Sequence, residues 1–466
     1  MPTGSSRCRY RHRTDQILTA AFEAAITEAA HGGDPMMDLA RRLFPLCRSL
    51  TGAGVRQTLD ILAERMPLER HRAASGTRCF AWTVPPEWNV RDAYVNGPSG
   101  ERVIDFRANN LHLVSYSIPI RTRLSLAELR PHLHSLPDQP DAIPYRTSYY
   151  AEAWGFCLSD RQKRGLVEGT YKVVIDVTLA PGHLDYASAE IGGDGDLVLF
   201  STYICHPSMA NNELSGPILL AQLYRALPGI PGLRHRYRFL FIPETIGSIL
   251  YLSLHGDDLR RSLHSGYVVT CAGDAGPYTY KRSRRGTASV DRIALHALRH
   301  TVERERLNVV DFDPASGSDE RQYCSPGFDL PVGSVIRSMY GRYPEYHTSL
   351  DDLSFISAEG LSGTLTALLR IVEAGELNRS YVRADPHCEP QLGRRGLYPS
   401  LGASKVADAQ VRRLMYLLNY SDGAHDLIAI AERLDEPVWA LAGALEDLLR
   451  ADLLRPSPQD RPVSPR

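Results

Sequence analysis

The sequence predicts an α/β protein with an inserted β-rich segment and a small helical module near its C-terminal end. Beyond residue 195, apolar runs typical of strands alternate with helical patterns, as in "DLVLFSTYI" followed by "GPILLAQLYRAL". Such alternation indicates a sheet covered by helices on both faces. Shorter runs such as "RCFAWTV" and "YKVVIDVTL", separated by Gly, Pro and Asn, come earlier and predict the β-rich segment.

These patterns divide the chain into four parts. Residues 1–35 are expected to be a flexible tail, because the basic stretch "RCRYRHR" leads into no continuous apolar run. Residues 36–78 and 185–390 are assigned to the α/β domain, and residues 79–184 to the insertion. Residues 400–466 carry three short helical patterns, which predict a winged-helix-like domain.

Helical spacing gives the expected helices of the α/β domain. Residues 36–66 are apolar at helical intervals interrupted by "TGAG", so two helices joined by a turn are predicted. Further helices are predicted at 290–305 and 359–374. In the C-terminal module, the second helix of the helix-turn-helix pattern, "PVWALAGALEDLL", has no basic residue to meet nucleic acid. Docking or homo-oligomerisation through this domain is the expected use.

Charge and composition exclude several classes of function. Lys and Arg number 53 against 54 Asp and Glu, so bulk charge gives no argument for nucleic-acid or membrane binding. No run approaches the ~18 apolar residues that a membrane span needs. The 8 cysteines form no CxxC pair, which is typical of reduced thiols in a cytoplasmic protein.

Four residues suited to metal binding or proton transfer follow predicted strands. They are His206, Glu244, Asp274 and His347. In open α/β sheets, ligands bind at the carboxyl ends of the strands, so these side chains are expected to converge. His, Asp and Glu are the ligands of hydrolytic Zn²⁺ sites. Each residue alone is compatible with a structural role, and the metal hypothesis depends on all four coinciding.

Several quoted motifs resemble a known family. "PPEWNVRDAYV", "CHPSMANNELSGP", "PETIGS", "GSDERQYCSPGFDLPVGS" and "YPEYHTSLDDL" are similar to the M28 zinc aminopeptidase superfamily, within a bacterial aminopeptidase-like group of unknown function. The resemblance covers about residues 36–455. It implies a zinc-aminopeptidase-like mixed sheet with helices on both faces, an inserted small β-domain and a C-terminal winged helix.

The resemblance also implies roles for the strand-end residues. His206, Asp274 and His347 would hold zinc with an open position for water, and Glu244 would be the general base. Two positions depart from the family pattern, because the bridging aspartate is Asn212 and the second glutamate is Thr245.

Two Zn²⁺ ions lying ~3.5–4 Å apart need bridging negative charge. An amide lacks that charge, so one zinc ion is predicted rather than two.

The residues next to these candidates each have two possible roles. Glu213 is either a substitute ligand or a partner of a ligand, and Asp351 either accepts a hydrogen bond from His347 or caps the next helix. Cys205 is expected to point into the core rather than to act as a nucleophile. Candidate substrate-binding residues lie in "IPYRTSYYAEAWGF" and "GSDERQY" and before His347; they are Arg146, Tyr149, Tyr150, Asp319, Glu320, Arg321 and Tyr346. Packing and salt bridges are the alternative roles.

The expected function is hydrolysis of an amide bond in a peptide or peptide-like metabolite, with Glu244 activating a metal-bound water. Three alternatives stay open. The first is an amidase or deacylase that acts on an aminoacylated sugar or natural-product intermediate. The second is an amide-transfer enzyme, and the third is a non-catalytic binding or regulatory protein.

Overall fold

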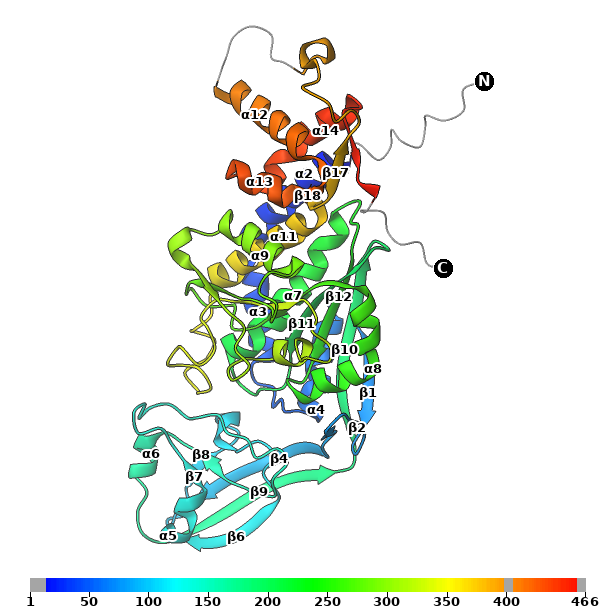
Figure 1. The fold of residues 1–466 in the computed structure, drawn as a ribbon. Coiled ribbons are helices and arrows are strands. Elements are labelled where there is room, and N and C mark those ends of the chain that lie inside the picture. The colour runs from blue at the N-terminus through cyan, green and yellow to red at the C-terminus, as the bar shows by residue number, and fades with distance from the viewer. Residues whose placement is uncertain (1–13, 398–404, 459–466) are drawn as a thin grey trace.

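The centre of the molecule is an eight-stranded mixed sheet with helices on both faces (Figure 1), which confirms the predicted α/β class. The structure is a computed structural model that describes residues 14–397 and 405–458. In spatial order, the strands are β1 (Glu69–Ala74), β10 (His183–Gly192), β12 (Arg236–Ile242), β11 (Leu197–Tyr203), β13 (Leu263–Val269), β16 (Val332–Ile336), β14 (Tyr278–Lys281) and β15 (Leu307–Val310).

Four neighbouring strands of this sheet run parallel. Strand β11 pairs in parallel with β12 and β13, and β13 pairs in parallel with β16. The pairs β1–β10, β10–β12 and β14–β16 are antiparallel. The carboxyl ends of β12, β11, β13 and β16 therefore lie at one edge of the sheet, where a ligand site is expected.

Both faces of the sheet are buried. Along β11, Val198 and Phe200 join one core cluster while Leu197 and Leu199 join another, as the alternation of strand side chains requires. The helices are α3 (Gly33–Leu43), α4 (Ala53–Ala63), α7 (Ser215–Ala226), α8 (Ile246–Ser262), α9 (Ser289–Arg299), α10 (Glu320–Tyr323) and α11 (Ala358–Leu377). The two helices predicted within residues 36–66 are confirmed as α3 and α4. The helices predicted at 290–305 and 359–374 are confirmed as α9, which ends earlier, and α11, which is slightly longer.

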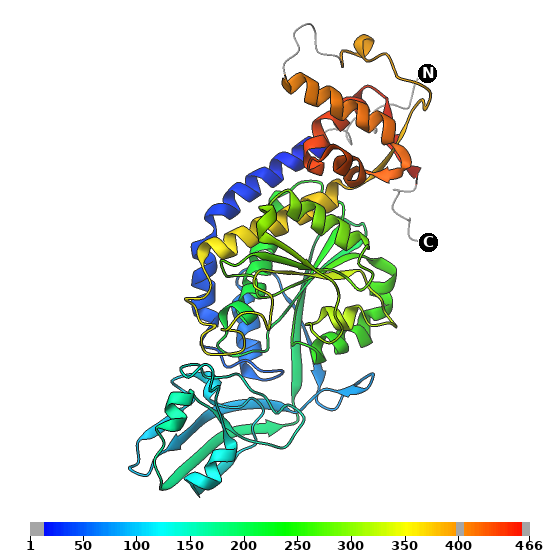
Figure 2. The ribbon, with the colours of Figure 1, turned by 60° about the vertical axis from the view of Figure 1, so that its left-hand side comes forward.

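The N-terminal segment is helical from Thr14, so the predicted flexible tail is wrong for residues 14–35; residues 1–13 lie outside the described part. Helix α2 (Thr14–His31) buries Leu18 and Phe22. It packs against α11 and reaches the C-terminal module, as Figure 2 shows. Burial of these apolar side chains stabilises the position of α2 against the rest of the protein.

The inserted segment leaves the large sheet after β1 and returns at β10. It contains a four-stranded antiparallel sheet in the order β5 (Arg102–Asp105), β4 (Glu87–Asn96), β9 (Thr170–Ala180) and β6 (Ile120–Ser125). Its smaller elements are β2 (Arg78–Cys79), β3 (Trp82–Thr83), α5 (Leu126–Leu129), β7 (Leu133–His134), β8 (Phe156–Cys157) and α6 (Asp160–Arg164). Its core is continuous with the cluster on one face of the large sheet.

The C-terminal module begins earlier than predicted. Strand β17 (Ser380–Arg383), placed by sequence in the α/β domain, pairs instead with β18 (Asp422–Asp426) and β19 (Leu454–Pro456). The helices of this module are α12 (Lys405–Tyr420), α13 (Leu427–Leu434) and α14 (Ala442–Arg450). Within the described part of the chain, no helix has the length and hydropathy needed to cross a membrane.

The module is tied to the α/β domain by polar contacts. Arg292 of α9 makes two bonds, of 2.7 and 2.8 Å, to the carboxylate of Asp426. The backbone N–H of Val438 donates to Nε2 of His296 at 2.9 Å. Helix α14 contacts α2, so the helix that would enter a DNA groove is packed inside the protein.

Replacing Glu373 with glutamine is expected to change how stability depends on pH. Glu373 of α11 is fully buried, and burial raises the pKa of its carboxyl to about 7, although Arg370 opposes the shift. A raised folded-state pKa means that stability is greatest below the usual pKa of glutamate and is lost as pH rises through about 7. Between pH 5 and pH 8, wild type should therefore lose up to about 3 kcal/mol relative to the variant.

Urea unfolding of both proteins at the two pH values measures this difference. Glu23→Gln is the matched control, because Glu23 also pairs with Arg370 but is 51% exposed. Equal pH dependence in wild type and Glu373→Gln would contradict the prediction.

Candidate active site

The candidate active site lies at the carboxyl ends of the parallel strands. His206 follows β11, Glu244 follows β12, and His347 lies in the segment between β16 and α11. Nε2 of His206 is 3.6 Å from Oε2 of Glu244. The ring centroids of His206 and His347 are 5.4 Å apart. Three of the four strand-end residues predicted from sequence therefore lie together.

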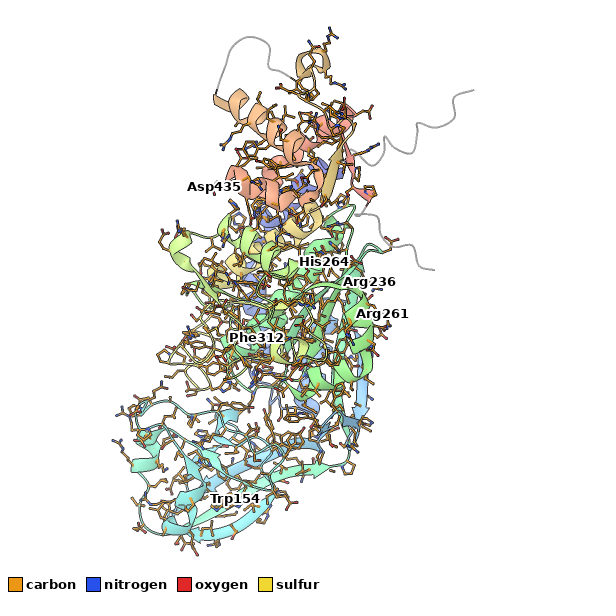
Figure 3. All side chains as sticks on the ribbon, viewed as in Figure 1. Trp154, Arg236, Arg261, His264, Phe312 and Asp435 are labelled. Carbon is orange, nitrogen blue, oxygen red and sulfur yellow. The ribbon has the colours of Figure 1, made fainter. Side chains whose placement is uncertain are left out.

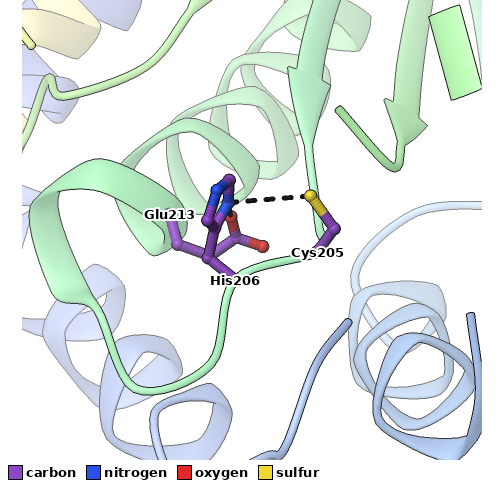
Figure 4. A group of neighbouring side chains, drawn as sticks. All are labelled: Cys205, His206 and Glu213. Atoms are coloured by element: carbon purple, nitrogen blue, oxygen red, sulfur yellow. Dashed lines mark hydrogen bonds and ion pairs between the residues drawn. The ribbon is translucent and has the colours of Figure 1, made fainter. Parts of the chain in front are cut away.

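A buried carboxylate orients His206. Nδ1 of His206 is 2.8 Å from Oε2 of Glu213, which lies in the short π-helix η3 (Ala210–Leu214) that follows (Figure 4). Because an ionised carboxylate only accepts, Nδ1 carries a proton, and Nε2 is the nitrogen on the side of Glu244. Burial opposes the charged ring, but Cys205 and Glu213 raise the pKa of His206 well above its usual value, so a metal ion would have to displace a proton from Nε2. This carboxylate–histidine arrangement is typical of a metal-binding imidazole.

The thiol of Cys205 does not form a catalytic relay with His206. Its Sγ is 3.6 Å from Nδ1, the same nitrogen that Glu213 engages, so no second ring nitrogen links thiol and carboxylate. Burial raises the pKa of Cys205 to about 11. In the described part of the chain, Cys205, His206 and Glu213 are the group whose potential ligand atoms all lie within 4.8 Å. Because both neighbours contact Nδ1, this cluster orients the His206 ring and leaves Nε2 on the side of Glu244.

His347 offers an unused nitrogen. Its Nε2 is buried and has no hydrogen-bond partner among the described residues. Burial, with a further effect of His206, lowers the pKa of His347 to about 3, so its imidazole is neutral at pH 7 and can act as a ligand. The ring stacks on Tyr346 at 3.9 Å, and Tyr145 contacts both histidines, with ring centroids 5.2 Å from each.

Glu244 is held by a serine and lies near a second acid. The hydroxyl of Ser318 donates to Oε1 of Glu244 at 2.6 Å. Burial raises the pKa of Glu244, as suits a group that takes up a proton near neutral pH. Burial and the charge of Glu244 raise the pKa of Asp319 to about 8. Oδ1 of Asp319 accepts bonds of 2.8 Å from the Thr245 N–H and the Ser248 hydroxyl.

Asp274 is engaged elsewhere, in contrast to its predicted place in a metal triad. Its carboxylate accepts from Asn211 Nδ2 at 2.8 Å, Ser338 Oγ at 2.7 Å and the Gly276 N–H at 2.6 Å. These donors occupy both oxygens. Asp274 therefore braces the residues that follow His206, and its role as a metal ligand stays a prediction.

Asp351 also supports the residues that follow His206. Its two oxygens accept from the N–H groups of Asn211 and Asn212 at 2.6 and 2.9 Å, at the start of a one-turn π-helix, η3 (Ala210–Leu214). The predicted role as a cap of the next helix is wrong, because the helix whose N–H groups Asp351 accepts precedes it in the sequence. Helix α11, which follows Asp351, is capped by Ser357 instead.

The two positions that depart from the family pattern remain uncharged parts of the site. Nδ2 of Asn212 donates to the Tyr203 hydroxyl at 2.8 Å, and its Oδ1 is buried without a partner in the described residues. Thr245 has φ 62°, a conformation that costs energy for a branched residue. His347 and Ser208 also have positive φ, at 56° and 42°. Strained backbone thus gathers in the loops of this site.

The candidate substrate-binding residues separate into two groups. Tyr149 and Tyr346 lie at the site, since the Tyr149 hydroxyl is 2.9 Å from that of Tyr145. Arg146 and Tyr150 are exposed, and Tyr150 donates to the Thr83 carbonyl. Trp154, labelled in Figure 3, stacks on His132 within the inserted domain, away from the site.

The second motif, "GSDERQY", is mainly structural. Glu320 is fully buried in an ion pair of 2.9 Å with Lys281, which supports the salt-bridge alternative for this residue. Arg321 is partly exposed, and its Nε donates to the Ser318 carbonyl at 3.4 Å. Asp319 is the member of the motif that reaches the neighbourhood of Glu244.

Sequence reasoning missed Arg48, Tyr145 and Ser318. Arg48 comes from the connection between α3 and α4, and Nε donates to the His206 carbonyl at 2.9 Å. No local pattern distinguishes a buried arginine in such a connection. Tyr145 and Ser318 lie inside the motifs quoted above. They directly precede Arg146 and Asp319, the charged residues that the sequence pointed to instead.

Comparison with known sequences places the chain in a family. A family described as a domain of unknown function, DUF4910, matches residues 37–378. The chain belongs to the DUF4910 family. A winged helix-turn-helix family matches residues 379–456 of this DUF4910 protein, in agreement with the module that begins at β17. A relative from Clostridium acetobutylicum, named for polysaccharide biosynthesis and an aminopeptidase-like domain, is 44% identical over 92% of this chain and 98% of the relative.

Solved structures show the fold type. A crystal structure from Clostridium acetobutylicum, which carries the name of a peptidase, is 42% identical and covers 94% of this chain and 100% of that one, with a TM-score of 0.88. The zinc aminopeptidase BSAP of Bacillus subtilis gives a TM-score of 0.55 at 12% identity, over 74% and 94% of the chains. Peptidase M28 of Shewanella amazonensis gives 0.55 at 13%, over 78% and 97%. The DUF4910 protein therefore has an M28 aminopeptidase-type fold.

Proposed function

We propose that this DUF4910 protein is a metal-dependent hydrolase that cleaves an amide bond in a peptide or peptide-like substrate. The observation that carries the proposal is the position of Nε2 of His206, 3.6 Å from the carboxylate of Glu244, beside the buried and unpartnered nitrogen of His347. Two imidazoles at strand ends are donors suited to zinc, and the carboxylate beside them is placed to act as a general base. The M28 aminopeptidase-type fold supports the same conclusion.

One ion fits these donors better than two. His206 and His347 would hold it, with a carboxylate oxygen of Glu244 close by. The ring centroids of His206 and His347 are 5.4 Å apart, although His347 is not part of the compact cluster around Cys205. A bound divalent ion would polarise the amide carbonyl and lower the pKa of water. For a second ion, Asn212 and Thr245 supply no charge and Asp274 is already engaged.

The residues around the donors have separate roles in this proposal. Glu244 takes a proton from the attacking water and returns it to the leaving nitrogen. Ser318 fixes the direction of the Glu244 carboxylate. Tyr145, which contacts both histidines, forms a wall contributed by the inserted domain.

A second candidate is hydrolysis of an amide on a sugar. The 44% identical relative is named for polysaccharide biosynthesis, which favours an acylated amino sugar over a general peptide. Requirement for a free α-amine separates the two: an aminopeptidase needs it, whereas a sugar amidase does not. We further propose that the C-terminal module serves docking or homo-oligomerisation, since α14 is packed against α2. A cytoplasmic location is part of the same proposal.

The test combines metal analysis with an activity survey. Purified protein is expected to contain about one zinc per chain by elemental analysis, following the single donor set. The zinc-loaded protein should release product from amide substrates, with and without a free α-amine, and chelator should stop the reaction. A chain that binds no divalent metal under these conditions would overturn the proposed function.

Replacing Ser318 with alanine is expected to lower kcat about tenfold, because one hydrogen bond to a charged group is lost. Loss of this donor also raises the pKa of Glu244, since the bond favours the carboxylate. The acid limb of the kcat–pH profile should therefore move to higher pH. Ser316→Ala, in the same loop but exposed, is the matched control. Unchanged kcat and an unmoved acid limb would contradict the role of Ser318.

A further inference from the structure

Arg48 is a fully buried guanidinium next to the candidate active site. Its Nε donates to the His206 carbonyl at 2.9 Å, and Nη1 donates to the Leu43 carbonyl at 2.6 Å. Nε is also 3.5 Å from Oε1 of Glu213, and both side chains are 0% exposed. Nη2 is buried and has no partner among the described residues. Burying a charged guanidinium this deeply destabilises the folded protein unless a negative charge or hydrogen bonds compensate it.

Glu213 is the group that needs that charge. Its carboxylate binds His206 through one oxygen and faces Arg48 through the other. His206 is a neutral donor when Nε2 is a ligand, so it brings no net positive charge. A carboxylate enclosed with a neutral imidazole alone would be an uncompensated buried charge. Arginine remains charged even when buried, and therefore suits the balancing role.

We propose that Arg48 is a positioning residue whose fixed positive charge balances Glu213 and thereby keeps His206 in place for a metal ion. In this inference, which rests on the proposed function, Arg48 balances Glu213, Glu213 holds Nδ1 of His206, and Nε2 is left in place for one ion. The segment "ANNE" has an uncharged residue, Asn212, at the position expected to bridge two ions. Its one acidic residue, Glu213, faces the guanidinium of Arg48.

The same contacts admit a purely structural role, in which Arg48 ties together two backbone carbonyls. The two roles differ in what they require of Glu213. A structural arginine acts independently of that carboxylate, so effects of Arg48 and Glu213 variants would add. A charge-balancing arginine makes the effects strongly non-additive, because removing both charges leaves no unpaired group.

The test uses full-length Arg48→Met, Arg48→Lys and Arg48→Met/Glu213→Gln proteins. Cobalt(II) is titrated into metal-free protein, with affinity from the visible absorption of bound cobalt, and thermal unfolding of the metal-free proteins is recorded. Arg48→Met should weaken cobalt binding about 10–100-fold, and Arg48→Lys should restore most of it. The double variant should unfold at a higher temperature than Arg48→Met yet still bind cobalt weakly. Arg42→Met, whose partner Glu64 is exposed, is the control.

The outcomes separate the inference from the proposed function. Wild-type affinity in Arg48→Met, no recovery in Arg48→Lys, or additive unfolding temperatures in the double variant would each overturn the role of Arg48 alone. Wild-type protein that binds no cobalt would overturn the proposed function, and this inference with it. If Arg48→Met does not fold, the lysine and double variants still give both readouts.

Discussion

Replacement of Glu244 by glutamine is expected to lower kcat about 10²–10⁴-fold, the usual contribution of a general base. Glutamine has nearly the same shape and still accepts the hydrogen bond from Ser318, but it cannot take up a proton from water. The fold should be unchanged, and metal should still bind through His206 and His347. Steady-state rates on the best amide substrate, with zinc content measured on the same samples, give the result.

Glu64→Gln controls for the loss of a carboxylate elsewhere, because Glu64 is exposed in an ion pair on the surface. Full activity in Glu244→Gln would remove Glu244 as the base. A loss of zinc that parallels the loss of rate would instead identify Glu244 as a ligand, which its 3.6 Å distance from His206 allows.

His347→Ala and His206→Ala are expected to abolish high-affinity metal binding, and their effects on stability should differ. His347 has an unpartnered buried Nε2, so the metal-free alanine variant should unfold near the temperature of metal-free wild type. His206 is bound to Glu213, and its removal leaves that carboxylate unpaired on one side. The metal-free His206→Ala protein should therefore be clearly less stable, by about 1–3 kcal/mol.

Thermal unfolding with and without zinc measures both effects, because an ion that binds only the folded chain raises the unfolding temperature. His132→Ala is the matched control, since His132 lies in the inserted domain against Trp154. A zinc-dependent rise in either active-site variant equal to that of wild type would exclude that histidine as a ligand.

The position of the site was predictable because strand ends are visible in the sequence. Apolar runs end just before His206 and Glu244, and parallel strands bring such ends together. Asp274 satisfied the same criterion but is taken up by Asn211 and Ser338. Sequence spacing gives the place of a side chain along a strand, but not the donors that two distant segments, around Asn211 and Ser338, direct at it. Arg48 was missed for the same reason.

The fold was predictable where periodicity is strong and failed where contacts are distant in sequence. Helix α2 is rich in alanine and shows little contrast between its faces, so its burial against α11 had no clear signal. Strand β17 has only 4 residues, and its partners come tens of residues later. A strand that short is defined by its neighbours rather than by its own residues.

Helix α2 is made first during translation, while its partners α11 and α14 are made last. At ~5–20 residues per second, its apolar side chains must wait some tens of seconds on the ribosome before any of these contacts can form. A chain stopped before residue 358 would lack both α11 and α14, and the apolar side chains of α2 would have neither of these partners to pack against.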